Sequence, residues 1–308
     1  MVYLKLLKVS YSNALFEKRK FLDANQSYKN NFEQIGKDFL KAYNYSLGDK
    51  SLEKSASFIE STSVLYNRGF MYEGASMAHG FNIEMSLNRK LDCYSKLFSE
   101  WNDHIYMVHV GLGWAYSRIP LFSVESRIKK FDPVLRWLVI DGMGFHDTYF
   151  YTKKVLIEKK VSQKLKDPYA THVYYQGVGR CLWFVYSGNL SLLNKTIASF
   201  PLEYQTDLWA GVGLASVYAV GVDENILSAV KTLPQKFFPA FAQGVCFGSK
   251  ARGRAKNITD LNANAAQLLI SMDINEAASL TDQFYPVGEG ESSALDRQWK
   301  QTIQNYFK

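Results

Sequence analysis

A short phrase centred on glycine recurs six times along the chain and restricts the folds that this sequence can adopt. Each copy places a glycine among small and aromatic residues, and successive copies lie 31 to 37 residues apart. A spacing near 34 is the length of a helix–turn–helix repeat. The spacing therefore predicts an array of tandem α-helical hairpins. The six anchor glycines are Gly74, Gly111, Gly142, Gly177, Gly211 and Gly244.

The glycines themselves indicate how such helices pack. Glycine inside a helix costs about 1 kcal/mol relative to alanine, so six of them require a physical reason. Five are followed four positions later by another small residue, and positions i and i+4 share a helix face. We expect this face to admit the backbone of a neighbouring helix. The five pairs are Gly74/Ala78, Gly111/Ala115, Gly177/Cys181, Gly211/Ala215 and Gly244/Gly248; Gly142 is instead followed by His146.

Composition supports a folded repeat protein. The 308 residues are 47% hydrophobic and include 20 Phe, 20 Tyr and 6 Trp, which excludes a disordered or fibrous chain. We expect an all-α fold, a tetratricopeptide-like or solenoid-like array, with a single repeat domain at residues 31–308 after a basic segment at 1–30. The tetratricopeptide consensus itself is not satisfied. Similar phrases further suggest two duplicated halves, at about 30–130 and 170–270.

Charge is a weak constraint on partners. The net charge of +7 is below what a dedicated nucleic-acid binder needs, so we expect no nucleic acid. Basic residues gather in the N-terminal segment and near residues 250–256. These clusters are either solvated faces or contacts with an anionic membrane surface or an acidic partner. They comprise Lys5, Lys8, Lys18, Arg19 and Lys20, and Lys250, Arg252, Arg254 and Lys256.

Cysteines and apolar runs indicate the compartment. Three widely separated cysteines form no disulfide framework, and the N-terminus lacks a secretory signal pattern. The longest uncharged apolar run, Leu208–Val222, is shorter than the roughly 20 residues of a membrane span. We expect a cytoplasmic protein that is at most membrane-peripheral.

Cofactor motifs are not evident. The five histidines form no metal-binding pair, and the sequence has no Walker loop, nucleophile elbow or complete dinucleotide fingerprint. We therefore expect neither a metal nor a cofactor.

A row of polar residues accompanies the glycines. The residue before the anchor is Glu73, Asp141, Gln176 or Gln243 in four of the six copies. Equivalent positions line up along one surface of a stacked array. Such a row is either a hydrogen-bond network between helices or the lining of a groove or pocket.

The segment Asp141–Asp147, "DGMGFHD", is the densest group of ionisable residues. Acid–base catalysis would require His146 oriented by a carboxylate from Glu73, Asp147 or Asp207. The alternative is a buried histidine with a structural hydrogen bond. The candidate catalytic residues are Glu73, His109, Asp141 and His146.

Aromatic residues crowd the same phrases, and they form either an ordinary core or an apolar cavity suited to an acyl, terpenoid or polyene chain. They are Phe70, Tyr72, Trp114, Tyr116, Phe145, Tyr149, Phe150, Tyr151, Trp183, Phe184, Trp209 and Tyr218.

Three basic residues that follow anchor glycines, Arg180, Lys250 and Arg252, are suited to bind a carboxylate or a phosphate. The candidate ligand-binding residues are Tyr72, Trp114, Asp147, Gln176, Arg180, Trp183, Asp207, Trp209, Gln243, Lys250 and Arg252.

Several phrases occur in the order found in a known bacterial family. "RGFMYEGASMA", "VHVGLGWAYSR", "DGMGFHDTYF", "QGVGRCLWFVYSG", "DLWAGVGLASVYAVG" and "QGVCFGSKARGRA" resemble the UnbL-like proteins, from about Phe32 to Ala265. That family, of unknown function, is associated with polyketide synthases of enediyne gene clusters. The resemblance implies a role in making a polyketide-derived or polyunsaturated metabolite, beside UnbV-like and membrane UnbU-like partners. It implies no reaction and no catalytic residues.

Three hypotheses about function follow. The first is an accessory protein that binds an apolar chain or a partner biosynthetic protein. The second is an enzyme that isomerises, dehydrates or cyclises a polyene-like substrate by acid–base chemistry. The third is a peripheral membrane scaffold docked through the basic N-terminal segment.

Overall fold

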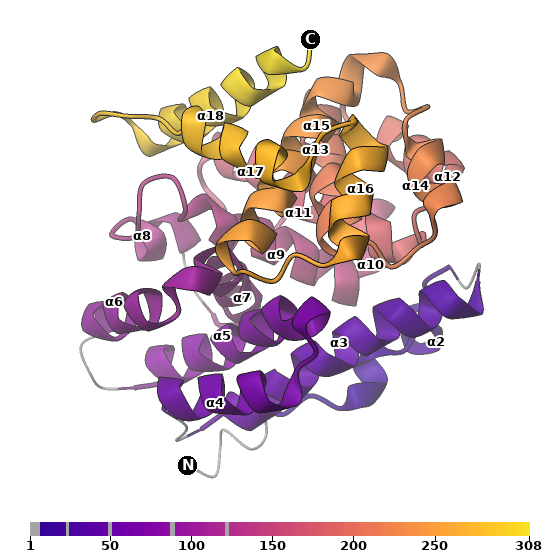
Figure 1. The fold of residues 1–308 in the computed structure, drawn as a ribbon. Coiled ribbons are helices and arrows are strands. Elements are labelled where there is room, and N and C mark those ends of the chain that lie inside the picture. The colour runs from indigo at the N-terminus through magenta and orange to yellow at the C-terminus, as the bar shows by residue number, and fades with distance from the viewer. Residues whose placement is uncertain (1–6, 23–24, 49–50, 87–89, 121–122) are drawn as a thin grey trace.

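Every element of regular secondary structure in residues 7–22, 25–48, 51–86, 90–120 and 123–308, the parts that this computed structural model describes, is a helix. The predicted all-α, solenoid-like array is therefore confirmed (Figure 1). Lys5, in the predicted basic segment, lies outside these ranges. The boundary near residue 30 and the two duplicated halves stay predictions.

Inner helices, most of them long, alternate with shorter outer ones, and each inner helix packs on the next inner helix along the chain (Figure 1). The central inner helices are buried over most of their circumference, and in α7 every residue from Met107 to Tyr116 is buried; the first and last inner helices bury mainly one face. They are α3 (Gln26–Ser46), α5 (Arg68–Glu84), α7 (Ile105–Arg118), α9 (Trp137–Phe150), α11 (Pro168–Val185), α13 (Leu202–Tyr218), α15 (Phe238–Arg254) and α17 (Ile274–Gln283).

The outer helices bury only one face. In α12, Leu193 and Ile197 are buried at a spacing of four, which is the pattern of a surface helix. Several begin at a side-chain cap, such as Asn189 on α12 and Asp223 on α14. They are α4 (Leu52–Thr62), α6 (Lys90–Glu100), α8 (Val124–Ile128), α10 (Thr152–Leu156), α12 (Leu190–Ala198), α14 (Glu224–Val230) and α16 (Asp260–Ile270).

Two further segments flank the array. At the N-terminus, the 3-10 turn η1 (Tyr11–Ala14) and the short helix α2 (Phe16–Arg19) pack on α3 and on each other. At the C-terminus, α18 (Ser292–Tyr306) packs on α15 and α17. Three more 3-10 turns lie between helices: η2 (Leu65–Asn67), η3 (Asn102–His104) and η4 (Gln235–Phe237).

The anchor glycines lie where the backbones of consecutive inner helices touch. A Cβ atom on Gly177 of α11 would lie 1.8 Å from the carbonyl oxygen of Asp141 on α9. The same contact joins five of the six anchor glycines to the residue that precedes the anchor glycine of the previous helix, and the first anchor, Gly74, meets the carbonyl oxygen of Phe39 on α3 in the same way. The other pairs are Gly111 with Glu73, Gly142 with Val110, Gly211 with Gln176, and Gly244 with Ala210.

A second glycine, two residues after the anchor, makes the equivalent contact with the following helix. A Cβ on Gly179 would lie 2.0 Å from the carbonyl oxygen of Leu208 on α13. Gly113, Gly144 and Gly213 make the same kind of contact. In α5 this position is Ser76, whose hydroxyl donates to the carbonyl of Val108 at 2.7 Å. The sequence predicted one close-packing face per helix; the structure shows two, because positions i and i+2 point to opposite neighbours.

The array curves back on itself, so that its first helices contact helices late in the chain. The ring of Phe32 on α3 lies 4.8 Å from that of Phe184 on α11, and Asn31 donates to the carbonyl of Gly221 at 3.1 Å. Arg252 of α15 donates to the carbonyl of Tyr66 at 2.8 Å. These contacts join the first repeats to the later ones and enclose an interior.

A methyl group at a helix contact should destabilise the protein. We expect Gly177→Ala to lower the free energy of unfolding by about 3 kcal/mol, because helix backbones must separate to admit the Cβ. Urea unfolding followed by circular dichroism measures this change.

The matched control is Gly253→Ala in α15, where the nearest atom to a new Cβ lies 3.8 Å away. That variant should be unchanged or more stable by about 1 kcal/mol, because alanine favours a helix. Equal stabilities for the two variants would contradict the close backbone contact.

Candidate functional site

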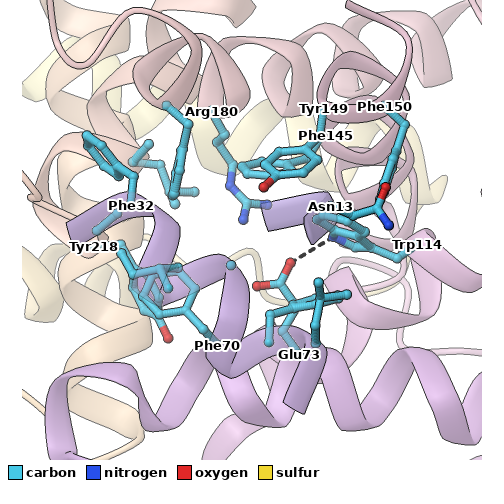
Figure 2. A pocket seen from close by; sticks show the side chains of 18 residues that line it. Asn13, Phe32, Phe70, Glu73, Trp114, Phe145, Tyr149, Phe150, Arg180 and Tyr218 are labelled. Carbon is cyan, nitrogen blue, oxygen red and sulfur yellow. Dashed lines mark hydrogen bonds between the residues drawn. The ribbon is translucent and has the colours of Figure 1, made fainter. Parts of the chain in front are cut away.

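An apolar cavity lies inside the curve of the array, between the first six inner helices and the N-terminal turn (Figure 2). It leaves about 50 Å³ for water-sized molecules, which is room for a few waters. Any larger ligand would therefore have to displace side chains. The apolar and aromatic lining residues are Phe32, Ile35, Phe39, Leu40, Phe70, Trp114, Phe145, Tyr149, Phe150, Phe184, Leu214, Ala215, Tyr218 and Ala219.

Glu73 of α5 is the one carboxylate among these lining residues. Its Oε1 accepts a hydrogen bond from Nε1 of Trp114 at 2.9 Å (Figure 2). Burial raises the pKa of Glu73 to about 7, against the opposing effects of the Arg180 charge and the Trp114 hydrogen bond. Near neutral pH, Glu73 is thus able both to hold and to release a proton.

Arg180 of α11 faces Glu73 across the cavity, as Figure 2 shows. Its guanidinium forms a buried ion pair with Asp141 of α9, and it lies 5.2 Å from the centre of the Phe145 ring. Asp141 also accepts a hydrogen bond from Gln176 at 2.8 Å. The charge of Arg180 is therefore balanced by Asp141, and an ionised Glu73 would be a second negative charge in an apolar space.

A second apolar cavity lies beyond Arg180. It leaves about 40 Å³ for water-sized molecules, and it shares Arg180, Leu214 and Tyr218 with the first cavity. Helix α18 contributes Asp296, Trp299 and Lys300 to its wall. The interior thus consists of two adjoining cavities separated by a few side chains.

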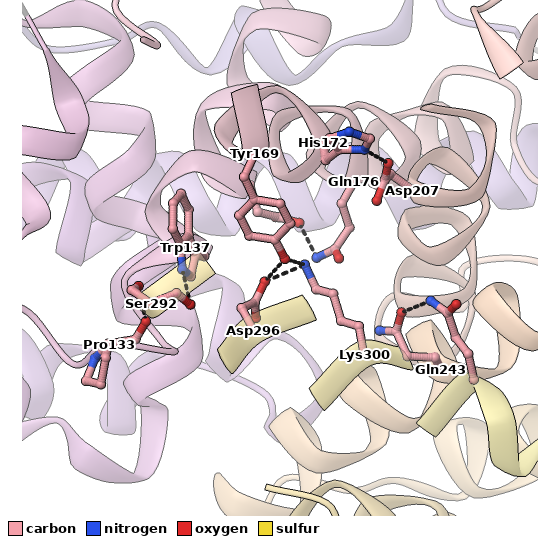
Figure 3. A network of polar contacts seen from close by, with 12 residues as sticks. Pro133, Trp137, Tyr169, His172, Gln176, Asp207, Gln243, Ser292, Asp296 and Lys300 are labelled. Atoms are coloured by element: carbon pink, nitrogen blue, oxygen red, sulfur yellow. Dashed lines mark hydrogen bonds and ion pairs between the residues drawn. The ribbon is translucent and has the colours of Figure 1, made fainter. Parts of the chain in front are cut away.

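A network of polar contacts attaches α18 over the second cavity (Figure 3). Lys300 pairs with Asp296 at 2.8 Å, and Asp296 accepts a hydrogen bond from the hydroxyl of Tyr169 on α11. At the start of the helix, Trp137 donates to the carbonyl of Ser292 at 3.1 Å. These contacts fix α18 as a cover for the second cavity.

The four candidate catalytic residues do not form one constellation. Glu73 lines the first cavity, and Asp141 lies behind Arg180. His146 is hydrogen-bonded to Asp147 at 2.9 Å and is absent from the lining of either cavity. His109 stacks on Phe98, at a ring distance of 4.5 Å. Burial lowers the pKa of His146, and lowers that of His109 to about 4, so both are neutral at physiological pH.

Some candidate ligand-binding residues meet at the cavities. Trp114 and Arg180 line the first, and Gln176, Arg180 and Lys250 line the second. Gln243 contacts Gln304 of α18 at 3.3 Å.

The other candidates lie elsewhere and have partners of their own. Asp207 is bonded to His172 at 2.7 Å, and Tyr72 stacks on His104. Asp147 accepts bonds from His146 and Tyr174. Trp183 donates to the carbonyl of Val220, and Trp209 stacks on Phe237. Arg252 is fully buried and donates to the carbonyl of Tyr218 at 3.1 Å.

The wall contributed by α3 was missed in the sequence. Phe32, Ile35, Phe39 and Leu40 line the first cavity, yet α3 lacks the glycine phrase that drew attention to the other inner helices. Their spacing of three and four residues was the available signal.

The described part of the chain brings no three His, Cys, Asp or Glu side chains together in a way that would suit a metal ion. Nor does it contain a helix with the length and apolar character needed to cross a membrane.

The fold and the cavities define a class: an all-helical repeat protein whose inner helices join at glycine contacts and enclose an apolar interior with a buried ionisable centre. The chain belongs to the family described as protein of unknown function (DUF1702), whose sequence profile matches residues 2–307. No curated protein and no solved structure matches it. The association with enediyne gene clusters stays a prediction.

The raised pKa of Glu73 gives stability a pH dependence that Glu73→Gln should remove. Above pH 4.5 the unfolded chain releases the Glu73 proton while the folded protein holds it up to about pH 7. The wild type should therefore lose roughly 3 kcal/mol relative to the variant between pH 4.5 and 7, with no further change above. Urea unfolding across this range measures the difference. A difference that is constant with pH would contradict the buried, protonated state.

Proposed function

We propose that this protein is an accessory protein that binds an apolar, chain-like molecule in its interior. The observation that carries the proposal is the aromatic cavity with Glu73 and Arg180 on facing walls. Binding sites for small molecules are typically apolar spaces with a few converging polar groups. The resemblance to UnbL-like proteins suggests that the molecule is a polyketide-derived or polyene chain, or that a biosynthetic partner protein delivers it.

The charges in the cavity favour a ligand whose polar group is neutral. Arg180 is balanced by Asp141, and Glu73, with a pKa of about 7, holds a proton below neutral pH. A protonated Glu73 is a hydrogen-bond donor for a carbonyl or hydroxyl oxygen. A carboxylate would add an unbalanced negative charge to an apolar space. An ester, thioester, ketone or alcohol therefore suits this site better than a free acid.

The shared wall suggests where a long molecule would lie. Leu214 of α13 lines both cavities. Displacing its side chain would join the two spaces beside Arg180. A chain could then extend through both, with its polar group near Glu73.

Methyl cis-parinarate, a neutral polyene ester that fluoresces in apolar surroundings, tests the proposal. We expect saturable binding of one ester per protein, and at pH 6, where Glu73 holds its proton, an affinity at least tenfold higher than for parinaric acid, which is ionised in solution at that pH. Leu214→Trp should weaken ester binding at least tenfold, because the larger side chain fills the shared wall. Fluorescence titration measures both.

The matched control is Leu261→Trp on α16, where the side chain is 57% exposed and lines neither cavity. It should bind the ester like the wild type. Circular dichroism confirms that both variants are folded. No saturable binding, or equal affinities of the two variants, would exclude the interior as the binding site.

The pKa of Glu73 favours a second candidate function, acid–base isomerisation. A carboxylate with a pKa near 7 removes and returns protons efficiently at neutral pH. Next to a carbonyl, it would take a proton from one carbon of a β,γ-unsaturated chain and return it to the far carbon of the double bond. The N–H groups of Arg180 would donate hydrogen bonds to the oxygen of the intermediate enolate, whose negative charge replaces that of the ionised Glu73.

Deuterium uptake from D2O into the N-acetylcysteamine thioester of 3-decenoic acid tests this chemistry. We expect exchange next to the carbonyl, at a rate reduced at least 100-fold by Glu73→Gln. Mass spectrometry of the recovered thioester measures the rate. Glu33→Gln is the control, because Glu33 is a buried carboxylate that pairs with Lys37 and does not line the cavity. Equal rates in the wild type and Glu73→Gln would rule out the catalytic role.

A further inference from the structure

A surface groove lies between α2 and the junction of α9 with α10, two places far apart in the sequence. It has a volume of about 580 Å³. We call it the basic groove, after the cations on its rim: Lys18 and Lys20 on one side, and Lys153 and Lys154 on the other. It joins part of the predicted basic N-terminal segment to a basic cluster that the sequence analysis did not single out.

The positive charge of the basic groove is uncompensated. Glu158 is the one carboxylate in its lining, and it pairs with Lys160 at 2.7 Å. Within the described ranges, none of the four rim lysines forms an ion pair; Lys18 instead donates to the hydroxyl of Ser12 at 3.1 Å. The groove therefore attracts a surface with many negative charges.

Two exposed apolar side chains stand among these lysines. Ile157 is 71% exposed and Tyr151 is 55% exposed, and both belong to the groove lining. The ammonium of Lys154 lies 6.0 Å from the centre of the Tyr151 ring. An aliphatic and an aromatic side chain surrounded by lysines is the arrangement of proteins that insert a few side chains into an anionic bilayer.

The basic groove also shares a wall with the first cavity. Tyr149 and Phe150 line both. Arg19 lies over the Phe150 ring at 5.0 Å and donates to Asn13, which lines the cavity. An apolar molecule leaving a bilayer at this groove would need to displace only these side chains to enter.

We propose that the basic groove docks the protein on an anionic lipid bilayer. The preference for a bilayer over an acidic protein rests in part on the proposed function, because a lipid surface supplies apolar molecules beside the cavity wall. Docking is peripheral, through Lys18, Lys20, Lys153 and Lys154, with Ile157 and Tyr151 entering the headgroup region.

Sedimentation with lipid vesicles tests the docking. In 100 mM NaCl, the wild type should bind vesicles of phosphatidylcholine with one quarter phosphatidylglycerol at least tenfold more tightly than pure phosphatidylcholine. Lys153→Glu with Lys154→Glu should weaken binding to the anionic vesicles at least tenfold, because each basic residue at such a surface contributes several-fold. Ile157→Asn should weaken it several-fold without changing the net charge.

The matched control reverses two adjacent exposed lysines elsewhere, Lys129→Glu with Lys130→Glu. They line another groove, whose other cations, Lys90 and Arg127, pair with Glu84. This control has the same net charge as the test variant, and it should bind anionic vesicles within about threefold of the wild type.

Three results would overturn the proposal: no preference for the anionic vesicles, equal losses in the two double variants, or full binding of anionic vesicles by the Lys153→Glu, Lys154→Glu variant. A lack of preference for anionic vesicles is also what docking to an acidic protein would predict. Leu214→Trp should retain vesicle binding while it loses the parinarate ester, so failure of the docking and failure of the internal site are distinguishable.

Discussion

Direct contact between helix backbones at glycine determines the rest of this structure. At each anchor glycine, a carbonyl oxygen of the preceding helix lies so close that a Cβ atom on the glycine would overlap it. A side chain at these points would force consecutive helices apart. The carbonyls belong to Phe39, Glu73, Val110, Asp141, Gln176 and Ala210, and the last five each precede an anchor glycine. Three members of the polar row, Glu73, Asp141 and Gln176, are therefore positioned by how the helices meet.

That constraint also positions the ionisable residues of the interior. Because the carbonyls of Glu73 and Asp141 are held at equivalent helix contacts, their side chains start from fixed points on α5 and α9. Arg180 reaches Asp141 from α11, one residue after the second glycine of that helix. One cation thus lies near two carboxylates. Asp141 forms the ion pair with Arg180, and Glu73 retains its proton to near neutral pH.

The sequence was sufficient to predict the helical array, because the length of the repeat and the spacing of its glycines can be read directly along the chain. It also singled out seven of the cavity's aromatic residues, as members of either an ordinary core or an apolar cavity: Phe70, Trp114, Phe145, Tyr149, Phe150, Phe184 and Tyr218. It did not predict that α3 completes the wall, because Phe32 meets Phe184 only through the curvature of the whole array. The sequence left Glu73, Asp147 and Asp207 as possible partners of His146, and in the structure His146 is hydrogen-bonded to Asp147, its neighbour along the chain.

The contacts between the first and the later repeats have a consequence for how this protein can change. In an open solenoid, a duplicated repeat lengthens the superhelix and leaves every other interface intact. Here an additional repeat would separate Phe32 from Phe184 and Tyr66 from Arg252, and would open the interior to water. The number of repeats is therefore set by closure. Changes that preserve this closure are those confined to the side chains lining the cavities and to the outer helices.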